Sequence, residues 1–420
     1  MEMRKITLGD CIIDCASGPF GSNLKVECFV EDGFPIIDGA NLKGVRVTDN
    51  ITKFVTEEKA RSLSRSIAKR RDVIVTISGT LGQISFIPND SKYNEYLCSQ
   101  RQFRVTFDES KIDVEYLVNY LHTDFGQKKI LSFANYVGVP ALAQPLPNFK
   151  KIELLIPSIQ NQKKVVQVLS ALDGKIALNK KMNQKLEAMA KRLYDYWFVQ
   201  YDFPDKNGHP YKITGGPMTY NPTLKREIPE GWEVDVVGNV CETVLGGTPS
   251  TENESFWNGN IPWLNSGEVA EFPILNAEKR ITEDAVKNSA TAYLPAGSVT
   301  LSITRHLRPS IMAIDACINQ SVAGIKENDI LKNGYLYPYL VNEIPRLNTL
   351  RGGAQQPHIN KDTVDKSPIA LPTQNVLHQY YEKVNPLYNE IIEKAKESQK
   401  LTTLRDKLLP LLMNGQVEVE

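Results

Sequence analysis

The sequence lacks the motifs from which common enzyme sites are built. Its 420 residues include six cysteines and five histidines, and no CxxC pair or cysteine–histidine group has the spacing of a metal site. It has no GxxxxGK[ST] phosphate loop and no GxGxxG dinucleotide fingerprint. The Asn/Asp-Pro-Pro-aromatic tetrapeptide used by amino-methyltransferases is also missing. These absences predict no metal site and favour a binding protein over an enzyme.

Long apolar runs are missing as well. No segment approaches the roughly 20 apolar residues of a membrane span, and the first residues, MEMRKITLGD, contain no apolar signal core. The cysteines are scattered, which is typical of buried thiols in a reducing compartment. We therefore expect a soluble cytoplasmic protein.

A net charge is absent too, because 49 basic residues balance 49 acidic ones. This excludes a protein that is basic all over, such as a DNA coater. The balance hides an uneven distribution. Residues 159–200 carry eight basic and three acidic side chains, whereas residues 231–373 carry eleven basic and sixteen acidic ones. The first half of the chain is therefore expected to provide more of any attraction to phosphate groups.

What the sequence does contain is an internal repeat at about half its length. Short segments of the first half recur in the second half in the same order, which is much stronger than any single match. The matching pairs are FPIIDGANL with IPWLNSGEV, RRDVIVTISGTLGQISFI with PAGSVTLSITRHLRPSIMAI, YLCSQ with ACINQ, NYVGVPAL with RGGAQQPHI, and LLIPSIQNQ with IALPTQNVL. Each repeat begins with short β-branched runs separated by Gly, Pro and Asn, which predicts an α+β globule.

Each globule is followed by a long helical segment, and this order predicts five parts. We expect a first globular domain at 1–158, a helix at 159–200, a connector at 201–230, a second globular domain at 231–373 and a helix at 374–420. The connector is rich in turn-forming residues, with aromatic residues spaced through it, so it should pack against a surface.

The two long segments share an apolar seam that repeats about every 3.5 residues, the pattern of a coiled coil. Each helix would be about 40 residues and about 60 Å long at about 1.5 Å per residue. The predicted seam consists of Val165, Leu169, Leu172, Ile176, Asn179, Asn183, Leu186 and Leu193 in the first helix, and Tyr380, Val384, Leu387, Ile391, Lys394, Ser398, Leu401 and Leu408 in the second.

Both seams are polar at their centres, at Asn179 and Asn183 in the first helix and at Lys394 and Ser398 in the second. An antiparallel pairing would bring these two centres together. We hypothesise that they fix the register, as buried polar seam residues can. The alternative, that these four side chains face solvent, stays open.

Two groups of side chains are candidates for DNA contact. The first is a basic run suited to a phosphate backbone, although a solvated helix face would look the same: Lys59, Arg61, Arg65, Lys69, Arg70 and Arg71. The second combines Arg with His and Gln, and Arg and Gln form paired hydrogen bonds with base edges. Its members are Arg305, His306, Arg308, Gln355 and Gln356, any of which could equally be an ordinary surface residue.

Several longer motifs resemble those of one known family. The segments GGTPSTENESFWNGNIPWLNSGEV, LYDYWFVQYDFP, KREIPEGWEV and LRDKLLPLLMNGQVEV are similar to the specificity subunit of type I restriction–modification systems, and the resemblance covers essentially the whole chain. It implies two target-recognition domains in tandem, separated by two helices that form an antiparallel coiled coil. Each domain would read one half of a split, asymmetric DNA site, and the helices would set the gap.

The resemblance also suggests which loops lie near DNA. These are the GGTPST loop at 246–251, its counterpart at 17–22, and the loops at 78–83 and 304–310, although a purely structural role for these turns remains an alternative. The candidate residues in them are Ser78, Thr80, Gln83, Thr248, Ser250 and Thr304. The 304–310 loop departs from the family pattern. The turn at 351–357 is similar to the family's glycine–glutamine turn, and its counterpart at 136–140 lacks the glutamine.

The family further implies partners that carry the chemistry. Two methyltransferase subunits would bring S-adenosylmethionine, and restriction subunits would bring ATP and Mg²⁺, so this chain would have no catalytic residue or cofactor of its own. Two alternatives remain from the residues alone. One is a stand-alone sequence-specific nuclease, and the other is a coiled-coil adaptor that binds no DNA.

Overall fold

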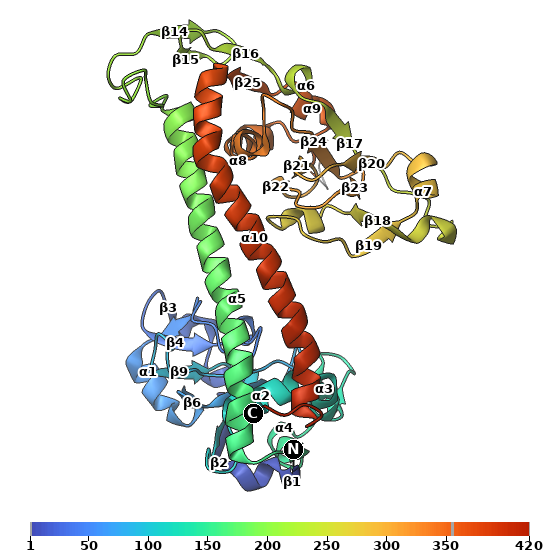
Figure 1. Ribbon diagram of the computed structural model, residues 1–420. Helices are drawn as coiled ribbons and strands as arrows, with labels where there is room; N and C mark the ends of the chain where they lie inside the picture. The colour runs from blue at the N-terminus through green and yellow to red at the C-terminus, as the bar shows by residue number, and fades with distance from the viewer. Residues whose placement is uncertain (1, 354–356, 420) are drawn as a thin grey trace. The chain divides into compact units, whose positions relative to one another are not determined.

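The computed structural model describes residues 2–353 and 357–419, and the chain divides into two compact units (Figure 1). The first unit comprises Met1–Lys175 and Leu401–Glu420, and the second comprises Ile176–Lys400. Both long helices contribute one end to each unit.

The first unit is built on two sheets. A four-stranded antiparallel sheet has the order β2-β10-β7-β8, formed by β2 (Ile12–Ser17), β10 (Gln102–Phe107), β7 (Val73–Thr76) and β8 (Ile84–Phe86). A second sheet has the order β3-β5-β4-β9-β6, formed by β3 (Phe29–Val30), β5 (Phe54–Val55), β4 (Phe34–Ile37), β9 (Glu95–Cys98) and β6 (Ile67–Lys69). The β-branched run of β7 is buried on both faces, as a strand inside a sheet between packed layers requires.

Two small strand pairs and four helices complete this globule. β1 (Arg4–Thr7) pairs with β13 (Glu153–Ile156), and β11 (Ala134–Asn135) pairs with β12 (Ala141–Leu142). The helices are α1 (Glu57–Ser62), α2 (Val114–His122), α3 (Asp124–Leu131) and α4 (Pro145–Lys150). The side chain of Asp113 caps α2 by accepting a hydrogen bond from the backbone of Tyr116, the usual role of an aspartate at this position.

The second unit repeats this topology. Its four-stranded sheet has the order β17-β24-β21-β22, formed by β17 (Thr243–Leu245), β24 (Val322–Ile325), β21 (Val299–Ser302) and β22 (Arg308–Ile311). The other sheet has the order β19-β18-β23-β20, formed by β19 (Lys279–Ile281), β18 (Trp257–Leu264), β23 (Ala316–Ile318) and β20 (Ala292–Leu294). β4 and β9 run parallel in the first unit, as do β18 and β23 in the second, so the predicted tandem repeat and the α+β class are confirmed.

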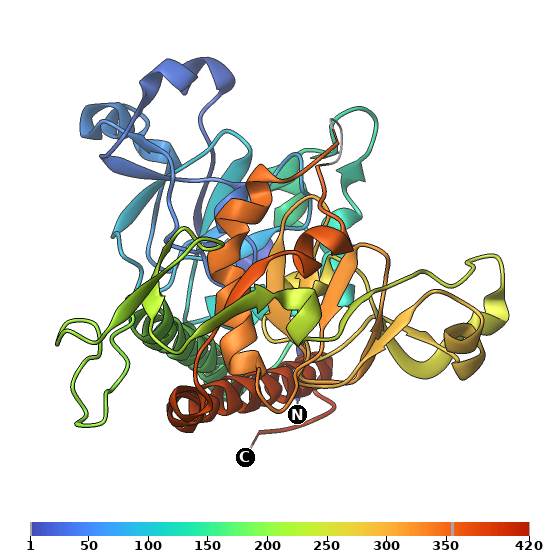
Figure 2. The ribbon, with the colours of Figure 1, turned by 90° about the horizontal axis from the view of Figure 1, so that it is seen from above.

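Further elements surround these sheets. β16 (Glu233–Val236) pairs with β25 (Pro368–Leu371), and β14 (Met218–Asn221) pairs with β15 (Arg226–Pro229). The helices are α6 (Val237–Val240), α7 (Glu283–Lys287), α8 (Asn333–Thr349) and α9 (Lys361–Asp365). Helix α8 packs on β21 and β22, and the part of the unit that contains α7 stands to one side of α8 (Figure 2).

The two long helices are α5 (Ile159–Tyr194), which continues into a π-helical turn at Asp195–Val199, and α10 (Gln374–Met413). Within the second unit Asn179 contacts Glu397, Asn183 contacts Ile391, and the ring of Tyr194 contacts that of Tyr380. Residues further along α5 contact residues that come earlier in α10, so the two helices are antiparallel there. In the first unit Asp173 and Arg405 form an ion pair of 2.8 Å. The predicted antiparallel coiled coil is confirmed.

The predicted seam residues are all buried or half-buried. The two polar centres lie opposite each other, as hypothesised. The Nδ2 atom of Asn179 donates to the Glu397 carboxylate at 2.8 Å, that of Asn183 donates to the Ile391 carbonyl at 3.0 Å, and the Ser398 hydroxyl donates to a carbonyl of its own helix. The direct contacts of the asparagines are to Glu397, which lies between Lys394 and Ser398 and 3.8 Å from the Lys394 ammonium, and to the backbone of Ile391. That these polar residues fix the register stays a prediction.

Each unit has its own core. In the first, the sheet packs against α2 and against residues of both long helices, including Val165, Leu169, Leu412 and Met413. In the second, the connector contributes the buried rings of Tyr201 and Phe203, which both contact the buried ring of Trp232 at the start of the second predicted domain. The prediction that the connector's aromatic residues pack against a surface is confirmed.

Four of the six cysteines are buried, but Cys15 and Cys28 are half-exposed, so the expectation of uniformly buried thiols was wrong for these two. Cys15 lies in β2, an edge strand of the four-stranded sheet, and Cys28 directly precedes β3. Within residues 2–353 and 357–419, the helices are all too short or too polar to cross a lipid bilayer.

Candidate nucleic-acid interface

Three loops of the first unit leave its four-stranded sheet at the same edge. β2 ends at Ser17 and β7 ends at Thr76, whereas the antiparallel β10 and β8 begin at Gln102 and Ile84. Residues 17–22, 77–83 and 99–101 are therefore neighbours, and we call them the loop edge of the first unit. The sheet brings together two of the loops singled out from the sequence and adds a third.

A polar hollow of about 560 Å³ opens at this edge. Its walls include Lys53, Thr80, Gln83, Gln100 and Arg101. The amide of Gln83 is held by the Gly39 carbonyl and the Thr76 hydroxyl, so Gln83 shapes the hollow, while Thr80 and Arg101 are exposed. Hydroxyl and guanidinium groups displayed on a loop can donate to phosphates or to base edges.

The loop at 17–22 is held close to the strand ends. The backbone of Gly18 donates to the Gln102 carbonyl at 2.7 Å, and a Cβ atom at Gly18 would lie 1.8 Å from the Ser99 carbonyl oxygen. The Gln100 side chain donates to the Leu24 carbonyl at 2.6 Å. In the same loop, the Phe20 side chain is 82% exposed.

The second unit has an equivalent edge, formed by residues 246–251, 303–307 and 319–321. Here two indoles hold the glycine-rich loop: Trp263 donates to the Gly247 carbonyl at 3.2 Å, and Trp257 donates to the Ser250 carbonyl at 3.1 Å. The Thr248 hydroxyl also bonds to the Gln320 side chain. The loop is thereby fixed with Thr248 and Ser250 exposed and Gly247 buried.

The neighbouring loop displays arginine and histidine side chains. Arg305, His306 and Arg308 are exposed, Thr304 is half-buried, and Arg305 has a positive φ of 58°. The guanidinium of Arg351 donates to the carbonyls of Arg305 and Pro357. Arg351 thus ties the following turn to this loop and is not itself displayed. Gln355 and Gln356 lie outside the described residues.

The corresponding turn of the first unit, at 136–140, is tied to the loop at 77–83 in the same way. A bridge joins Ser78 to Ala141, and the backbone of Gly79 donates to the Pro140 carbonyl at 2.9 Å. In the second unit the corresponding bridge joins Thr304 to His358. The repeat therefore extends to the way in which four segments assemble at each edge.

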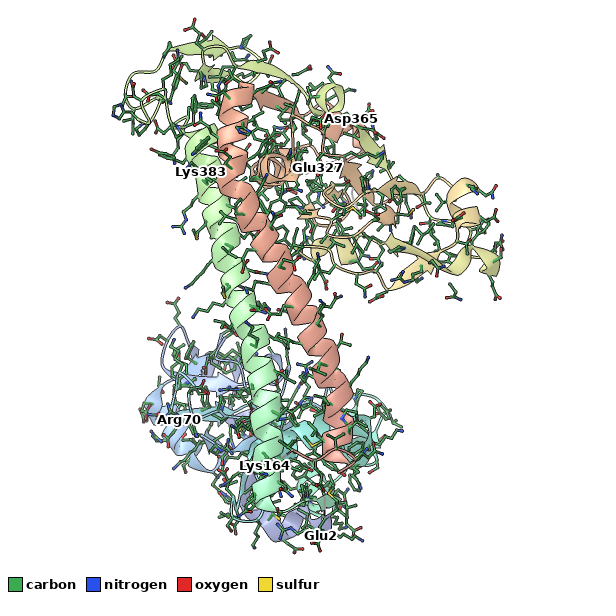
Figure 3. The ribbon with its side chains drawn as sticks, viewed as in Figure 1. Glu2, Arg70, Lys164, Glu327, Asp365 and Lys383 are labelled. Carbon is green, nitrogen blue, oxygen red and sulfur yellow. The ribbon has the colours of Figure 1, made fainter. Side chains whose placement is uncertain are left out.

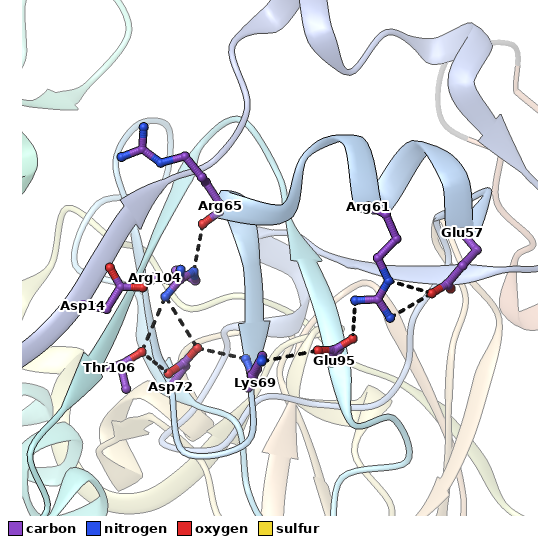
Figure 4. A network of polar contacts seen from close by, with 9 residues as sticks. All are labelled: Asp14, Glu57, Arg61, Arg65, Lys69, Asp72, Glu95, Arg104 and Thr106. Carbon is purple, nitrogen blue, oxygen red and sulfur yellow. Dashed lines mark hydrogen bonds and ion pairs between the residues drawn. The ribbon is translucent and has the colours of Figure 1, made fainter.

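The basic run at 59–71 does not form one free cationic face (Figure 4). Arg61 forms ion pairs with Glu57 and Glu95, Lys69 lies 3.7 Å from Glu95, and Arg71 pairs with Glu109 and Asp113. Three of its six cations are thus paired with carboxylates within the unit. Lys59 is half-buried on α1, and the Arg65 side chain is exposed, with its guanidinium away from the network.

A buried arginine organises this region. The Arg104 guanidinium donates to the Arg65 carbonyl at 3.0 Å and to the Asp14 carboxylate at 2.7 Å, and lies 4.0 Å from Asp72. Its hydrogen bond lowers the pKa of Asp14, whereas burial raises the pKa of Asp72. A buried ion network of this kind positions the chain, and here it fixes the backbone from which Arg65 projects.

Arg70 and Arg71 are separated from the loop edge. They precede β7, and the loop at 77–83 follows it, so the length of the strand lies between them. The Arg70 guanidinium donates to the Ser91 carbonyl at 3.1 Å, and Arg70 is exposed at the rim of the unit (Figure 3). The structure therefore does not bring these two residues together with Ser78, Thr80 and Gln83.

Reasoning from sequence missed Phe20, Gln100, Arg101 and Gln320 at the two edges. The signal for Gln100 and Gln320 was present, because both end matching segments of the repeat. In the part of the chain that the structure describes, no three His, Cys, Asp or Glu side chains form a group able to hold a metal ion.

Comparisons with known proteins agree with this architecture. A family model described as the type I restriction modification DNA specificity domain matches residues 28–188 and 229–403. The type I restriction enzyme MjaIX specificity subunit of Methanocaldococcus jannaschii is 24% identical over 374 residues, covering 87% of this chain and 82% of that protein. The HindI specificity subunit of Haemophilus influenzae is 23% identical over 320 residues, covering 63% and 69%.

A solved structure shares the fold. The S subunit of a type I restriction–modification system from M. genitalium superimposes with a TM-score of 0.60 at 12% sequence identity, covering 98% of this chain and 96% of that one.

Proposed function

Because the chain belongs to the type I restriction–modification DNA specificity family, and is thus a DNA-recognition subunit, we propose that each of its two units reads one half of a split DNA site through its loop edge. The helices α5 and α10 then set the gap between the halves. Two rigid reading modules on one chain bind a split site more tightly than either does alone, because the second contact becomes intramolecular.

The observation that carries this proposal is the duplicated loop edge. The same segments assemble at the same edge of the same sheet in both units, on strands of identical order. The side chains displayed there differ: Phe20, Thr80 and Arg101 in one unit, and Thr248, Ser250 and Arg305 in the other. Because direct readout depends on displayed side chains, the two half-sites should differ in sequence.

The proposal extends to the partners, which supply the chemistry. The tandem repeat offers two similar surfaces, which suits two methyltransferase subunits that carry S-adenosylmethionine. Restriction subunits would bring ATP and Mg²⁺. The chain itself would be non-catalytic and would act in the cytoplasm, where the DNA is accessible.

Mapping methylated adenines tests the proposal directly. The gene and its methyltransferase partner are expressed in a host that lacks other adenine methylation, and the genome is sequenced for modified bases. We expect a single motif of two short, different half-sites separated by a gap of unspecified bases. A continuous motif or no methylation would contradict the split reading, and cleavage of DNA by the purified chain with Mg²⁺ alone would support a nuclease instead.

Variants at the loop edges sharpen this test. Removing the Arg101 side chain in Arg101→Ala, or that of Arg305 in Arg305→Gly, should relax one half-site each and leave the other unchanged. Glycine is chosen at 305 because it accepts the positive φ. The loss should be about 1–3 kcal/mol of discrimination if the arginine reads a base. Lys287→Ala, an exposed cation on α7, is the matched control and should change neither half-site.

A further inference from the structure

The loop edge of the first unit carries an apolar tip. The β11–β12 hairpin displays Tyr136, Val137 and Val139, which are 64%, 88% and 67% exposed. Exposing three neighbouring apolar side chains is unfavourable for a free surface. A cluster of this kind marks a site of contact with another molecule.

This tip is held in a defined conformation. The Asn135 side chain accepts a hydrogen bond from the backbone of Val137 at 3.0 Å, and Gly138 has the positive φ of 76° that the turn requires. The backbone of Leu142 donates to the Ile77 carbonyl at 2.8 Å. Together with the Ser78–Ala141 bridge, these bonds make the hairpin a part of the loop edge.

The surroundings of the tip indicate what covers it. The hairpin joins the loop edge beside Gly79, where a Cβ atom would lie 3.6 Å from the Arg101 guanidinium. The apolar tip thus lies beside an exposed cation and beside the hydroxyl groups of Ser78 and Thr80. This combination is complementary to a surface that is mainly polar and anionic and carries isolated apolar groups. DNA viewed from its major groove has this character, because the thymine C5-methyl group is the apolar feature among polar base edges.

The corresponding turn of the second unit is different. It carries Arg351, Gly352 and Gly353 before the undescribed residues, and Pro357 and His358 after them. Its described residues include the exposed ring of Pro357, with Leu350 50% exposed just before the turn, but no counterpart of the exposed tyrosine and two valines. The apolar tip is therefore not required by the fold, and it does not suit a partner that binds both units alike, such as two copies of a methyltransferase.

We propose that Tyr136, Val137 and Val139 are specificity-determining residues that contact thymine methyl groups in the half-site read by the first unit. This inference rests on the proposed function. The side chains of Val137 and Val139 are smaller than the apolar wedges that enter between stacked bases, which favours contact with a methyl group in the groove over insertion.

The test removes single methyl groups from the DNA. Once the split motif is known, each thymine is replaced in turn by uracil in duplexes that contain it, and the affinity of the chain in complex with its methyltransferase partner is measured by competition. Uracil lacks only the C5-methyl group. Burial of one methyl-sized group corresponds to about a fourfold change in affinity, so we expect about a fourfold loss at one or more thymines of one half-site.

The variants Val137→Ser and Val139→Ser connect that loss to the hairpin. In at least one of them, thymine and uracil duplexes should bind equally at the sensitive position. Ile13→Ser is the matched control, since Ile13 is 68% exposed and lies at the end of β2 opposite the loop edge. This control should keep the full preference for thymine.

Four results would overturn the inference while leaving the split reading intact, and the first three concern binding. These three are a thymine preference that both valine variants retain, the absence of any sensitive thymine, and loss of the methyltransferase partner from the variant complex, which would make the hairpin a protein-docking element. Enhanced fluorescence of 2-aminopurine placed beside the sensitive thymine would indicate an inserted wedge and would also overturn it. Failure of the unmodified complex to prefer its motif would instead refute the proposed function.

Discussion

Two arginines that look equivalent in the sequence differ in the structure, because neighbouring carboxylates neutralise one and not the other. Arg65 and Arg61 lie four residues apart in the same basic run, yet the Arg61 guanidinium is held by Glu57 and Glu95 whereas that of Arg65 projects outward. Only a cation that is available to a phosphate displaces counterions from DNA. The structure thus distinguishes two arginines that the sequence presents as equivalent.

We therefore predict that Arg65→Gln lowers the salt dependence of DNA binding. If Arg65 contacts one phosphate, the slope of log K against log salt should fall by about 1, with affinity reduced for all sequences alike. The slope is measured by titration at several salt concentrations. Arg61→Gln serves as the control and should leave it nearly unchanged; equal slopes for wild type and Arg65→Gln would show that Arg65 does not face DNA.

The thiols give a second prediction at this scale. Burial raises the pKa of Cys98 to about 12 and those of Cys241 and Cys317 to about 11, and it raises the pKa of Cys11 as well. The thiolate is the reactive form, so these four should react slowly at neutral pH. We expect an aromatic disulfide reagent to modify Cys15 and Cys28 quickly in the native chain and all six thiols in denaturant. Fast reaction of any of the other four would contradict the predicted burial.

At the scale of an element, the centre of the coiled coil is the informative part. Asn179 is completely buried, and each of Asn179 and Asn183 donates one hydrogen bond to α10. Their Oδ1 atoms are buried with no hydrogen-bond partner among the described residues. An unsatisfied buried acceptor costs free energy, so this centre lowers stability and is expected to serve register instead.

Replacing both asparagines by leucine should accordingly stabilise the chain. We expect the free energy of unfolding to rise by about 1–3 kcal/mol, as measured by urea denaturation. Gln184→Leu, at an exposed position of the same helix, is the control and should have little effect. A lower stability of the double variant would mean that the two hydrogen bonds outweigh the unsatisfied oxygens.

The register role needs its own readout. Spin labels at positions 180 and 400, in a background with Cys15 and Cys28 changed to serine, report the stagger of α5 against α10 within the second unit. The wild-type asparagines should give one distance, and the leucine variant should give a broader or second distance. A single, unchanged distance in the leucine variant would exclude a role in register.

For the whole molecule, the proposed function makes helix length a determinant of the DNA site. Seven helical residues span about 10.5 Å, which corresponds to about three base pairs at about 3.4 Å each. Deleting residues 176–182 together with 394–400 removes one heptad from each helix, including Asn179 and its partner Glu397. The mapped motif should then keep both half-sites and shorten its gap by about three base pairs. An unchanged gap, or altered half-sites, would show that the helices do not set the spacing.

The residue pattern alone was sufficient to predict the repeated parts of this protein, namely its strands, its long helices and their order. The paired segments, the strands around Val73 and Val299 and the seam through Leu169 and Ile391 all follow from local spacing, because strand and helix periodicities are written into consecutive residues. Family-like motifs such as GGTPST then led to the DNA-recognition role. These features depend on residues that are neighbours in the chain, so they can be predicted from the sequence.

Which side chains are displayed was decided by the tertiary structure. Glu95, Glu109 and Asp14 lie far along the chain from the cations they neutralise, and the loops at 17–22, 77–83 and 99–101 become one edge only when β2, β7 and β10 align. The partners of Asn179 and Asn183 depend on the stagger of two helices about 200 residues apart. Ion pairing and packing act through space, and only the fold brings those distant residues within reach of one another.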